Sequence, residues 1–119
     1  MQERLESLFG RANPGWVPPV DLAEFDDRYV LSVELAGLRR ENVRIDLREH
    51  TLTVSGQRPG EGCCPERYQQ LERGQGYFSR SFRFALPIDT NAIAAELTDG
   101  VLTITIPKTH PSAMRVDVR

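Results

Sequence analysis

Apolar and polar residues alternate with a period of two along most of the central part of the chain. The clearest case is the stretch 43–49, in which Val43, Ile45 and Leu47 alternate with arginine and aspartate. Strict alternation with many β-branched residues is typical of strands that bury one face and expose the other. The pattern predicts strands at 29–36, 43–49, 51–57, 77–86 and 101–106.

Turn residues separate these stretches, as they do in antiparallel folds. Asp99-Gly100, which follows Leu97 and precedes Val101, is a strong signal for a tight hairpin. No stretch has the periodicity of a long helix. Short strands with a turn about every ten residues predict an all-β fold, an antiparallel β-sandwich of immunoglobulin-like type.

The two ends of the chain do not share the strand pattern. Residues 1–19 are predicted to form a short N-terminal arm, because a brief helical stripe of apolar residues is followed by several glycines and prolines. This arm either rests on the domain as a frayed end or serves as an adhesive surface for partners. Residues 109–119 form a mostly polar tail. We therefore expect one sandwich domain at 20–108 between two short flexible arms.

Three features are not needed by a plain sandwich. Arg80 lies on the apolar face of the predicted strand 77–86, where an unpaired guanidinium would be costly. The connection 58–76 is too long for a tight hairpin and contains a strand-like stretch at 67–72. The tail carries two valines that point the same way when it is extended. Together these features indicate contact with other protein chains through strand edges.

The charge balance excludes one class of function. The chain has 119 residues, with 15 lysines and arginines, 17 aspartates and glutamates, and a formal net charge of -2. General nucleic-acid binders need a concentrated basic surface, so we expect no nucleic-acid partner. No apolar run approaches the ~18–20 residues of a membrane-spanning helix, and the N-terminus has no apolar segment typical of a secretory signal. We expect a cytoplasmic protein without a membrane span.

Residues that could carry catalysis or bind metal are few. Cys63 and Cys64 are adjacent, and His50 and His110 lie far from the cysteines and from each other. This is neither the spacing of a disulfide framework nor that of a zinc site. The sequence has no nucleotide-binding glycine-rich loop and no hydrolase or metalloprotease motif. We expect no enzymatic activity, no cofactor and no metal, and a metal- or thiol-dependent enzyme is the remote alternative.

Five segments follow one another in the order PPVDLAEFDD, YVLSVELAGL, ENVRIDLREHTLTVSGQR, GYFSRSFRF and IDTNAIAAELTDGVLTITIPK. The last of them contains an A-x-x-x-x-G-V-L element at 95–102, and a Pro-Lys pair closes its strand. The tail sequence V-D-V is similar to an I-x-I/V motif. In this order and spacing the segments resemble the α-crystallin domain of small heat-shock proteins of bacterial type, over nearly all of 18–108.

This resemblance implies an ATP-independent chaperone, a holdase of the stress response that binds partly unfolded client proteins and suppresses their aggregation. The alternative from another class is an adaptor built on the related CS-type co-chaperone sandwich, which binds a folded partner. The strand-bearing connection and the V-D-V tail favour the chaperone, because the adaptor class resembles a monomer that lacks both features.

The resemblance also implies a homodimer formed by strand exchange. The stretch 67–72 of one chain would pair with the first strand of its partner, at about 20–25. Arg80 matches the arginine that the family places at the dimer interface. The residues expected at this interface are Arg80, Arg67, Tyr68, Gln69, Gln70, Leu71, Val20 and Leu22.

Two further surfaces are expected. The resemblance implies that Val116 and Val118 of the tail dock in an apolar groove of a neighbouring subunit, between strands at 43–49 and 93–97, and so build higher homo-oligomers. The groove residues expected are Val43, Ile45, Leu47, Ile93 and Ala95. Clients are expected to bind the apolar residues of the N-terminal arm, Leu5, Leu8, Phe9 and Trp16.

Overall fold

The computed structural model describes residues 15–58, 65–85 and 87–109. These residues form seven strands and two short 3-10 helices. The strands are β1 (Val20–Glu24), β2 (Arg28–Glu34), β3 (Val43–Arg48), β4 (Thr51–Arg58), β5 (Gly76–Arg83), β6 (Ala94–Thr98) and β7 (Val101–Pro107). The 3-10 helices are η1 (Arg40–Asn42), before β3, and η2 (Thr90–Ala92), before β6. The predictions for Leu5, Leu8, Phe9, Cys63, Cys64, His110, Val116 and Val118 lie outside the described residues.

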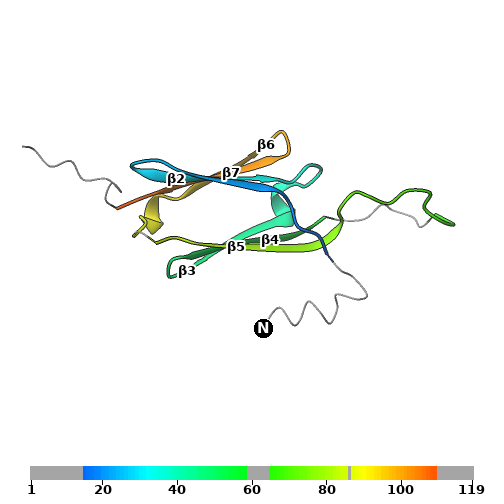
Figure 1. Cartoon of the computed structure of the whole chain (residues 1–119), viewed down its shortest axis with the longest axis horizontal. Helices are drawn as coiled ribbons and strands as arrows, with labels where there is room; N and C mark the ends of the chain where they lie inside the picture. Colours follow the sequence, from blue (N-terminus) through cyan, green and yellow to red (C-terminus); the bar gives the residue numbers. More distant parts are fainter. Residues whose placement is uncertain (1–14, 59–64, 86, 110–119) are drawn as a thin grey trace, which may run out of the picture.

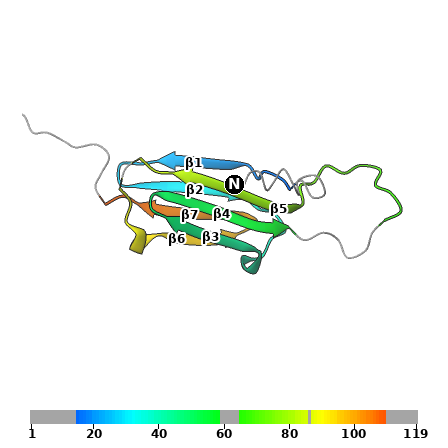
Figure 2. The same ribbon diagram turned by 90° about the horizontal axis from the view of Figure 1, so that it is seen from below.

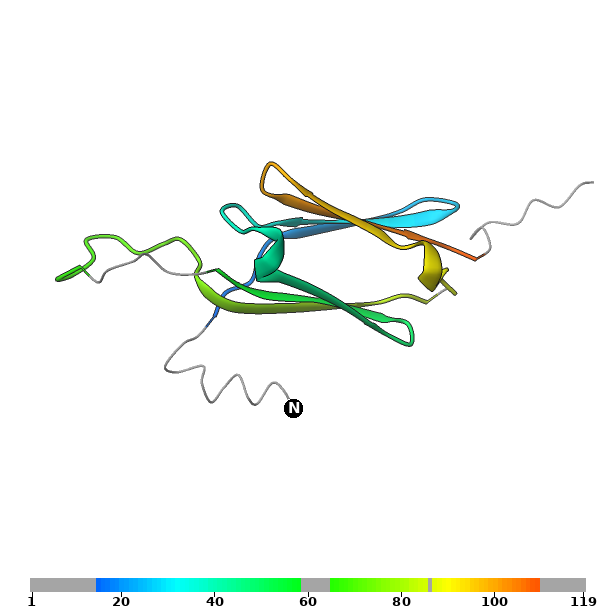
Figure 3. The same ribbon diagram turned by 180° about the vertical axis from the view of Figure 1, so that it is seen from behind.

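The strands form two sheets that lie face to face. One sheet has the order β1-β2-β7-β6, the other has the order β3-β4-β5, and every pairing is antiparallel. Figures 1 and 3 show the two layers, with η1 and η2 on the connections between them. The predicted antiparallel β-sandwich is confirmed.

The core lies between the two sheets and consists of the apolar residues of the alternating pattern. In β2, for example, Leu31 and Val33 are fully buried, whereas Val30 and Ser32 on the other face are only half-buried. Each buried aliphatic side chain contributes about 1.5–3 kcal/mol to folding. The core residues are Tyr29, Leu31, Val33, Leu35, Leu38, Leu52, Val54, Phe78, Phe84, Ile88, Leu102, Ile104 and Ile106.

The five strands predicted from the alternation are all present, as β2, β3, β4, β5 and β7. The largest difference is in β5, which ends at Arg83 although the alternation continues to 86. Thr51 is the first residue of β4 and pairs with Arg83, so β4 offers no partner beyond this point. Phe84 is nevertheless buried, and its N–H donates to the carbonyl of His50 at 2.9 Å.

The hairpin predicted at Asp99-Gly100 joins β6 to β7. Asp99 has a φ of 52° and Gly100 a φ of 80°. Positive φ angles at both central residues are what a two-residue type I′ turn requires, and glycine adopts them without a steric cost. Leu97 and Leu102 pair across the hairpin, and this prediction is confirmed.

Residues 65–75 of the long connection form no strand. We predicted a strand-like stretch at 67–72, but an extended segment becomes a strand only when a neighbour completes its hydrogen-bond ladder. Figures 1 and 2 show that the described part of this connection extends away from the sandwich, beyond the ends of β4 and β5. The strand prediction is therefore wrong for the single chain, and pairing with a second chain stays a prediction.

Candidate functional site

The β1 strand forms one edge of its sheet. It pairs with β2 on one side, and no described strand lies on its other side. From Asp21 to Glu24 its side chains are exposed, and Leu22 keeps 43% of its surface accessible. An edge strand of this kind is a template on which another extended chain can add a strand. Val20 and Leu22, both expected at a subunit interface, lie on this edge.

Arg80 lies in the middle of β5, which is an edge strand of the other sheet. Its side chain is half-buried, and Nη1 donates to the carbonyl of Pro18 at 2.9 Å. The guanidinium carbon lies 5.4 Å from the centroid of the Phe82 ring. Because Pro18 comes shortly before β1, this hydrogen bond joins the edge of one sheet to the edge of the other.

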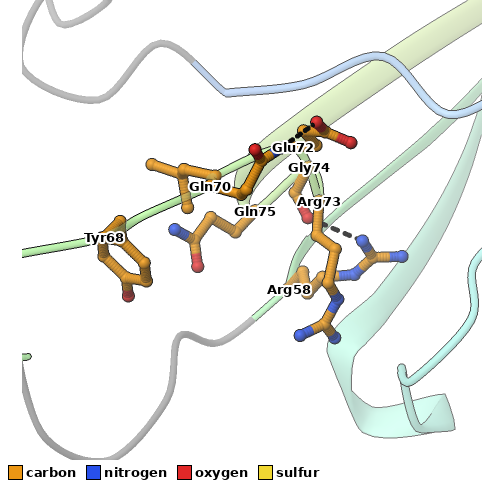
Figure 4. A pocket seen from close by; sticks show the side chains of 8 residues that line it. Arg58, Tyr68, Gln70, Glu72, Arg73, Gly74 and Gln75 are labelled. Carbon is orange, nitrogen blue, oxygen red and sulfur yellow. Dashed lines mark hydrogen bonds between the residues drawn. The ribbon is translucent and has the colours of Figure 1, made fainter.

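The described end of the long connection carries apolar side chains in contact with water. Tyr68 is 49% exposed and Leu71 is 58% exposed, and Arg67, Gln69 and Gln70 are exposed as well. A hollow of about 330 Å³ lies at the base of the connection. Figure 4 shows its lining, which comprises Arg58, Tyr68, Gln70, Leu71, Glu72, Arg73, Gly74 and Gln75. The expected interface residues of the connection therefore lie together on its accessible surface.

A groove of about 410 Å³ lies between β3 and β6, the edge strands on the opposite side of the sandwich. Val43, Ile45 and Ala95, three of the residues expected at a docking groove, line it, and the docking of a tail there stays a prediction. Leu47 and Ile93 were also expected there but are not among the residues that line this groove. Both are half-buried and packed against the core, as Val43 and Ile45 are too. The other lining residues are Arg40, Glu96, Leu97, Thr98 and Leu102.

Leu97 and Leu102 were missed in the groove, although the sequence contains the signal for one of them. Leu97 follows Ala95 by two positions, so the period that selected Ile93 and Ala95 also includes Leu97. Leu102 is its cross-strand partner, which only the register of the hairpin reveals. Arg40 reaches the groove from η1, and no periodic pattern predicts that position.

The structure places Trp16 on the sandwich rather than on a free arm. Its indole is half-buried and packs edge-on against Phe78, with ring centroids 5.4 Å apart. Nε1 donates to the carbonyl of Gly76 at 3.1 Å, and the main-chain N–H donates to the carbonyl of Tyr77 at 3.2 Å. A tryptophan side chain is most stable where its ring is packed against apolar groups and its N–H has a hydrogen-bond acceptor. The N-terminal arm is therefore anchored to the domain at Trp16.

Sequence reasoning missed an ion pair between Lys108, a buried lysine directly after β7, and Glu24, the half-exposed last residue of β1. The Lys108 side chain is fully buried, and its Nζ lies 2.7 Å from Oε2 of Glu24. The same Nζ donates to the carbonyl of Phe25 at 2.8 Å and lies 4.9 Å from the centroid of the Tyr29 ring. A buried ammonium requires such partners, because burial without them costs several kcal/mol.

Two arginines, Arg58 and Arg73, line the hollow together with Glu72. Burial lowers the pKa of Arg58 below its ordinary value, and the neighbouring Arg73 lowers it further. The guanidinium still remains protonated at neutral pH, because its ordinary pKa lies so far above 7. Arg58 is therefore a cation held partly out of water at the base of the connection.

Residues 15–58, 65–85 and 87–109 contain neither a cluster of metal ligands nor a helix that could span a membrane. No group of three or more histidine, cysteine, aspartate or glutamate side chains in these ranges is arranged to hold a metal ion. No helix in the same ranges is long and apolar enough to cross a membrane.

Comparison with known proteins identifies the family. The model of the Hsp20/alpha crystallin family matches residues 21–119, which include both sheets, the long connection and the tail. The chain belongs to this family. The resemblance to small heat-shock proteins and the α-crystallin type of sandwich are thereby confirmed. The CS-type adaptor, which was the alternative, is not supported.

Individual Hsp20 relatives agree with this assignment. Small heat shock protein C2 of Rickettsia felis is 35% identical over 100 residues, which are 83% of this chain and 65% of that protein. The chain thus spans less than two thirds of the length of this relative.

Solved structures of small heat-shock proteins share the fold. Heat shock protein 16.0 from Schizosaccharomyces pombe is 30% identical with a TM-score of 0.76, covering 87% of this chain and 97% of that one. A small heat-shock protein from Xylella fastidiosa, described as having a distinct high order structure, is 31% identical with a TM-score of 0.72 and the same coverage of 87% and 97%.

Proposed function

We propose that this member of the Hsp20/alpha crystallin family is an ATP-independent chaperone of the stress response. It binds partly unfolded proteins in the cytoplasm and suppresses their aggregation, without an enzymatic step or a cofactor. The observation that carries this proposal is the match of the family model to residues 21–119. The open edge of β1 and the apolar groove between β3 and β6 support it, because surfaces of both kinds bind extended polypeptide.

The proposed building block is a homodimer formed by strand exchange. Residues 67–72 of one chain pair with β1 of the other and complete the ladder that β1 leaves open. Three observations support this pairing: β1 is an exposed edge, the connection extends away from its own sandwich, and Tyr68 and Leu71 are exposed on it. Arg80 lies beside the start of β1, where it holds the edge in place.

Larger assemblies form through the tail. Val116 and Val118 of one chain dock in the groove of a neighbouring chain, against Val43, Ile45 and Ala95. Burying two valines gives about 1.5–3 kcal/mol each before the cost of ordering the tail is subtracted. One tail therefore binds weakly, and the two tails of a dimer act together because the first contact raises the effective concentration of the second.

Clients bind to apolar surface that is open to water. The arm residues Leu5, Leu8 and Phe9 supply part of it, and the groove supplies more whenever no tail occupies it. Trp16 anchors the arm in this account, because its indole is packed against Phe78. Apolar contact of this kind discriminates little between sequences, as a chaperone for many clients requires.

The test is the aggregation of a thermolabile client enzyme, followed by light scattering at constant temperature with and without ATP. We expect the chain to suppress scattering at a near-equimolar subunit ratio and to the same degree in both conditions. An inert protein at the same mass concentration is the control. Suppression no greater than that of the control, or suppression that appears only with ATP, would contradict the proposal.

A further inference from the structure

Arg58 joins the two ends of the long connection. It is the last residue of β4, and the connection returns to the sandwich at Gly74, two residues before β5. Nη1 of Arg58 donates to the carbonyl of Gly74 at 2.6 Å, and Nη2 donates to the carbonyl of Ala36 at 2.8 Å. Figure 4 shows the Arg58 side chain reaching the backbone at Gly74. One side chain thus closes the base of the connection and fastens it to the turn after β2.

Trp16 covers the same guanidinium. The guanidinium carbon of Arg58 lies 4.1 Å from the centroid of the indole, close enough for a cation–π contact. The hydrogen bonds from Trp16 to Gly76 and Tyr77 fix the indole on the first residues of β5. The root of the N-terminal arm and the base of the connection therefore share one cluster of contacts.

Two glycines make this cluster close-fitting. A Cβ atom on Gly74 would lie 2.7 Å from Cε3 of Trp16, which is too short for a real contact. A Cβ atom on Gly15, whose φ is 74°, would lie 2.5 Å from the carbonyl oxygen of Tyr77. A larger residue would force the Trp16 indole to shift at Gly74, or the Tyr77 backbone to shift at Gly15, so this close packing depends on both glycines.

We propose that Arg58 and Trp16 form a clamp that fixes the direction in which the long connection leaves the sandwich, which makes Arg58 a positioning residue for dimer formation. The inference rests on the proposed function, because residues 67–72 beyond the clamp are the segment proposed to pair with the partner's β1. A segment held at its base loses less conformational freedom when its far part is ordered by a partner. The clamp thus strengthens the dimer without touching the other subunit.

The test is Arg58→Met in the full chain, because methionine keeps an apolar stem beside the indole and removes both hydrogen bonds and the charge. Trp16 is the single tryptophan of the sequence, so tryptophan fluorescence reports on the surroundings of this one indole. We expect emission at longer wavelength, stronger quenching by acrylamide, and a dimer dissociation constant about tenfold higher, which corresponds to about 1.4 kcal/mol. The matched control is Arg44→Met, which removes an exposed arginine from β3 and should leave both readouts unchanged.

Wild-type emission and a wild-type dissociation constant in Arg58→Met would overturn the clamp. Altered emission with an unchanged dissociation constant would overturn the positioning role. If Arg58→Met does not fold, Gly74→Ala decides between the same outcomes, because its Cβ displaces the indole and leaves Arg58 in place. A wild-type chain that is monomeric at micromolar concentration would instead contradict the proposed dimer, and the tryptophan emission of Arg58→Met would still decide whether the clamp exists.

Discussion

At the scale of single residues, the buried Lys108 and the half-buried Arg80 each have identified partners that link separate strands. Lys108 brings the end of β7 to the end of β1 through Glu24 and the Phe25 carbonyl. Arg80 brings β5 to the residue that leads into β1. Since both side chains act on β1, the position of the proposed dimer edge is set by two cations whose burial would be unfavourable without these contacts.

Glu24→Gln tests the ion pair. The variant leaves the Lys108 ammonium buried without its counterion, while the amide can still accept one hydrogen bond. Because half of the Glu24 side chain is exposed, water screens part of the interaction, and we expect the free energy of unfolding to fall by about 1–2 kcal/mol in urea titrations. Glu34→Gln, at an exposed position of β2, should have no measurable effect. Equal stability of the two variants would show that the pair is unimportant.

Arg80→Met tests the contact with Pro18. Hydrogen bonds from charged donors contribute about 1.5–3 kcal/mol, and the variant leaves the Pro18 carbonyl without this donor. We expect a lower melting temperature and, because the start of β1 is no longer held, a smaller dimer fraction at micromolar concentration. Melting is followed by circular dichroism and mass by light scattering. A variant with the melting temperature and mass of the wild type would refute this role for Arg80.

At the scale of elements, the sequence predicts the strands that bury one face in the core. The alternation located β2, β3, β4, β5 and β7, because each must turn every second residue towards the core. The alternation did not locate the end of β5, because that end depends on where β4 begins. It also could not decide whether 67–72 forms a strand, because that depends on a partner strand. Arg58 could not be assigned its role either, because its carbonyl partners at Gly74 and Ala36 are set by tertiary structure.

The tail and the groove are tested together by Val116→Gly combined with Val118→Gly. The double variant removes the apolar side chains that are proposed to dock against β3 and β6, so any higher assembly should fall to dimers while the domain stays folded. Mass is measured by light scattering at micromolar concentration. Thr109→Gly combined with Ser112→Gly is the control for added tail flexibility and should keep the wild-type mass. Wild-type assembly in the double valine variant would mean that V-D-V plays no part in assembly.

At the scale of the whole molecule, the two proposed interfaces lie on opposite sides of the sandwich. Figure 2 shows β1 and β5 along one side and β3 and β6 along the other. The sheet orders explain this arrangement, because each sheet contributes one edge strand to each side. Dimer formation at β1 and tail docking between β3 and β6 therefore do not compete for surface. In the proposed dimer, the same separation would leave the groove open to the extended segments of clients that are proposed to bind there.

The central claim is that the chain holds unfolding proteins in solution, and the most direct measurement is of the complex itself. A thermolabile client is heated with the chain in the absence of nucleotide, and the supernatant is analysed by size-exclusion chromatography with light scattering. The account predicts that the client elutes with the chain, in particles heavier than either protein alone. Client found entirely in the pellet, in the same amount as with an inert control protein, would contradict the account.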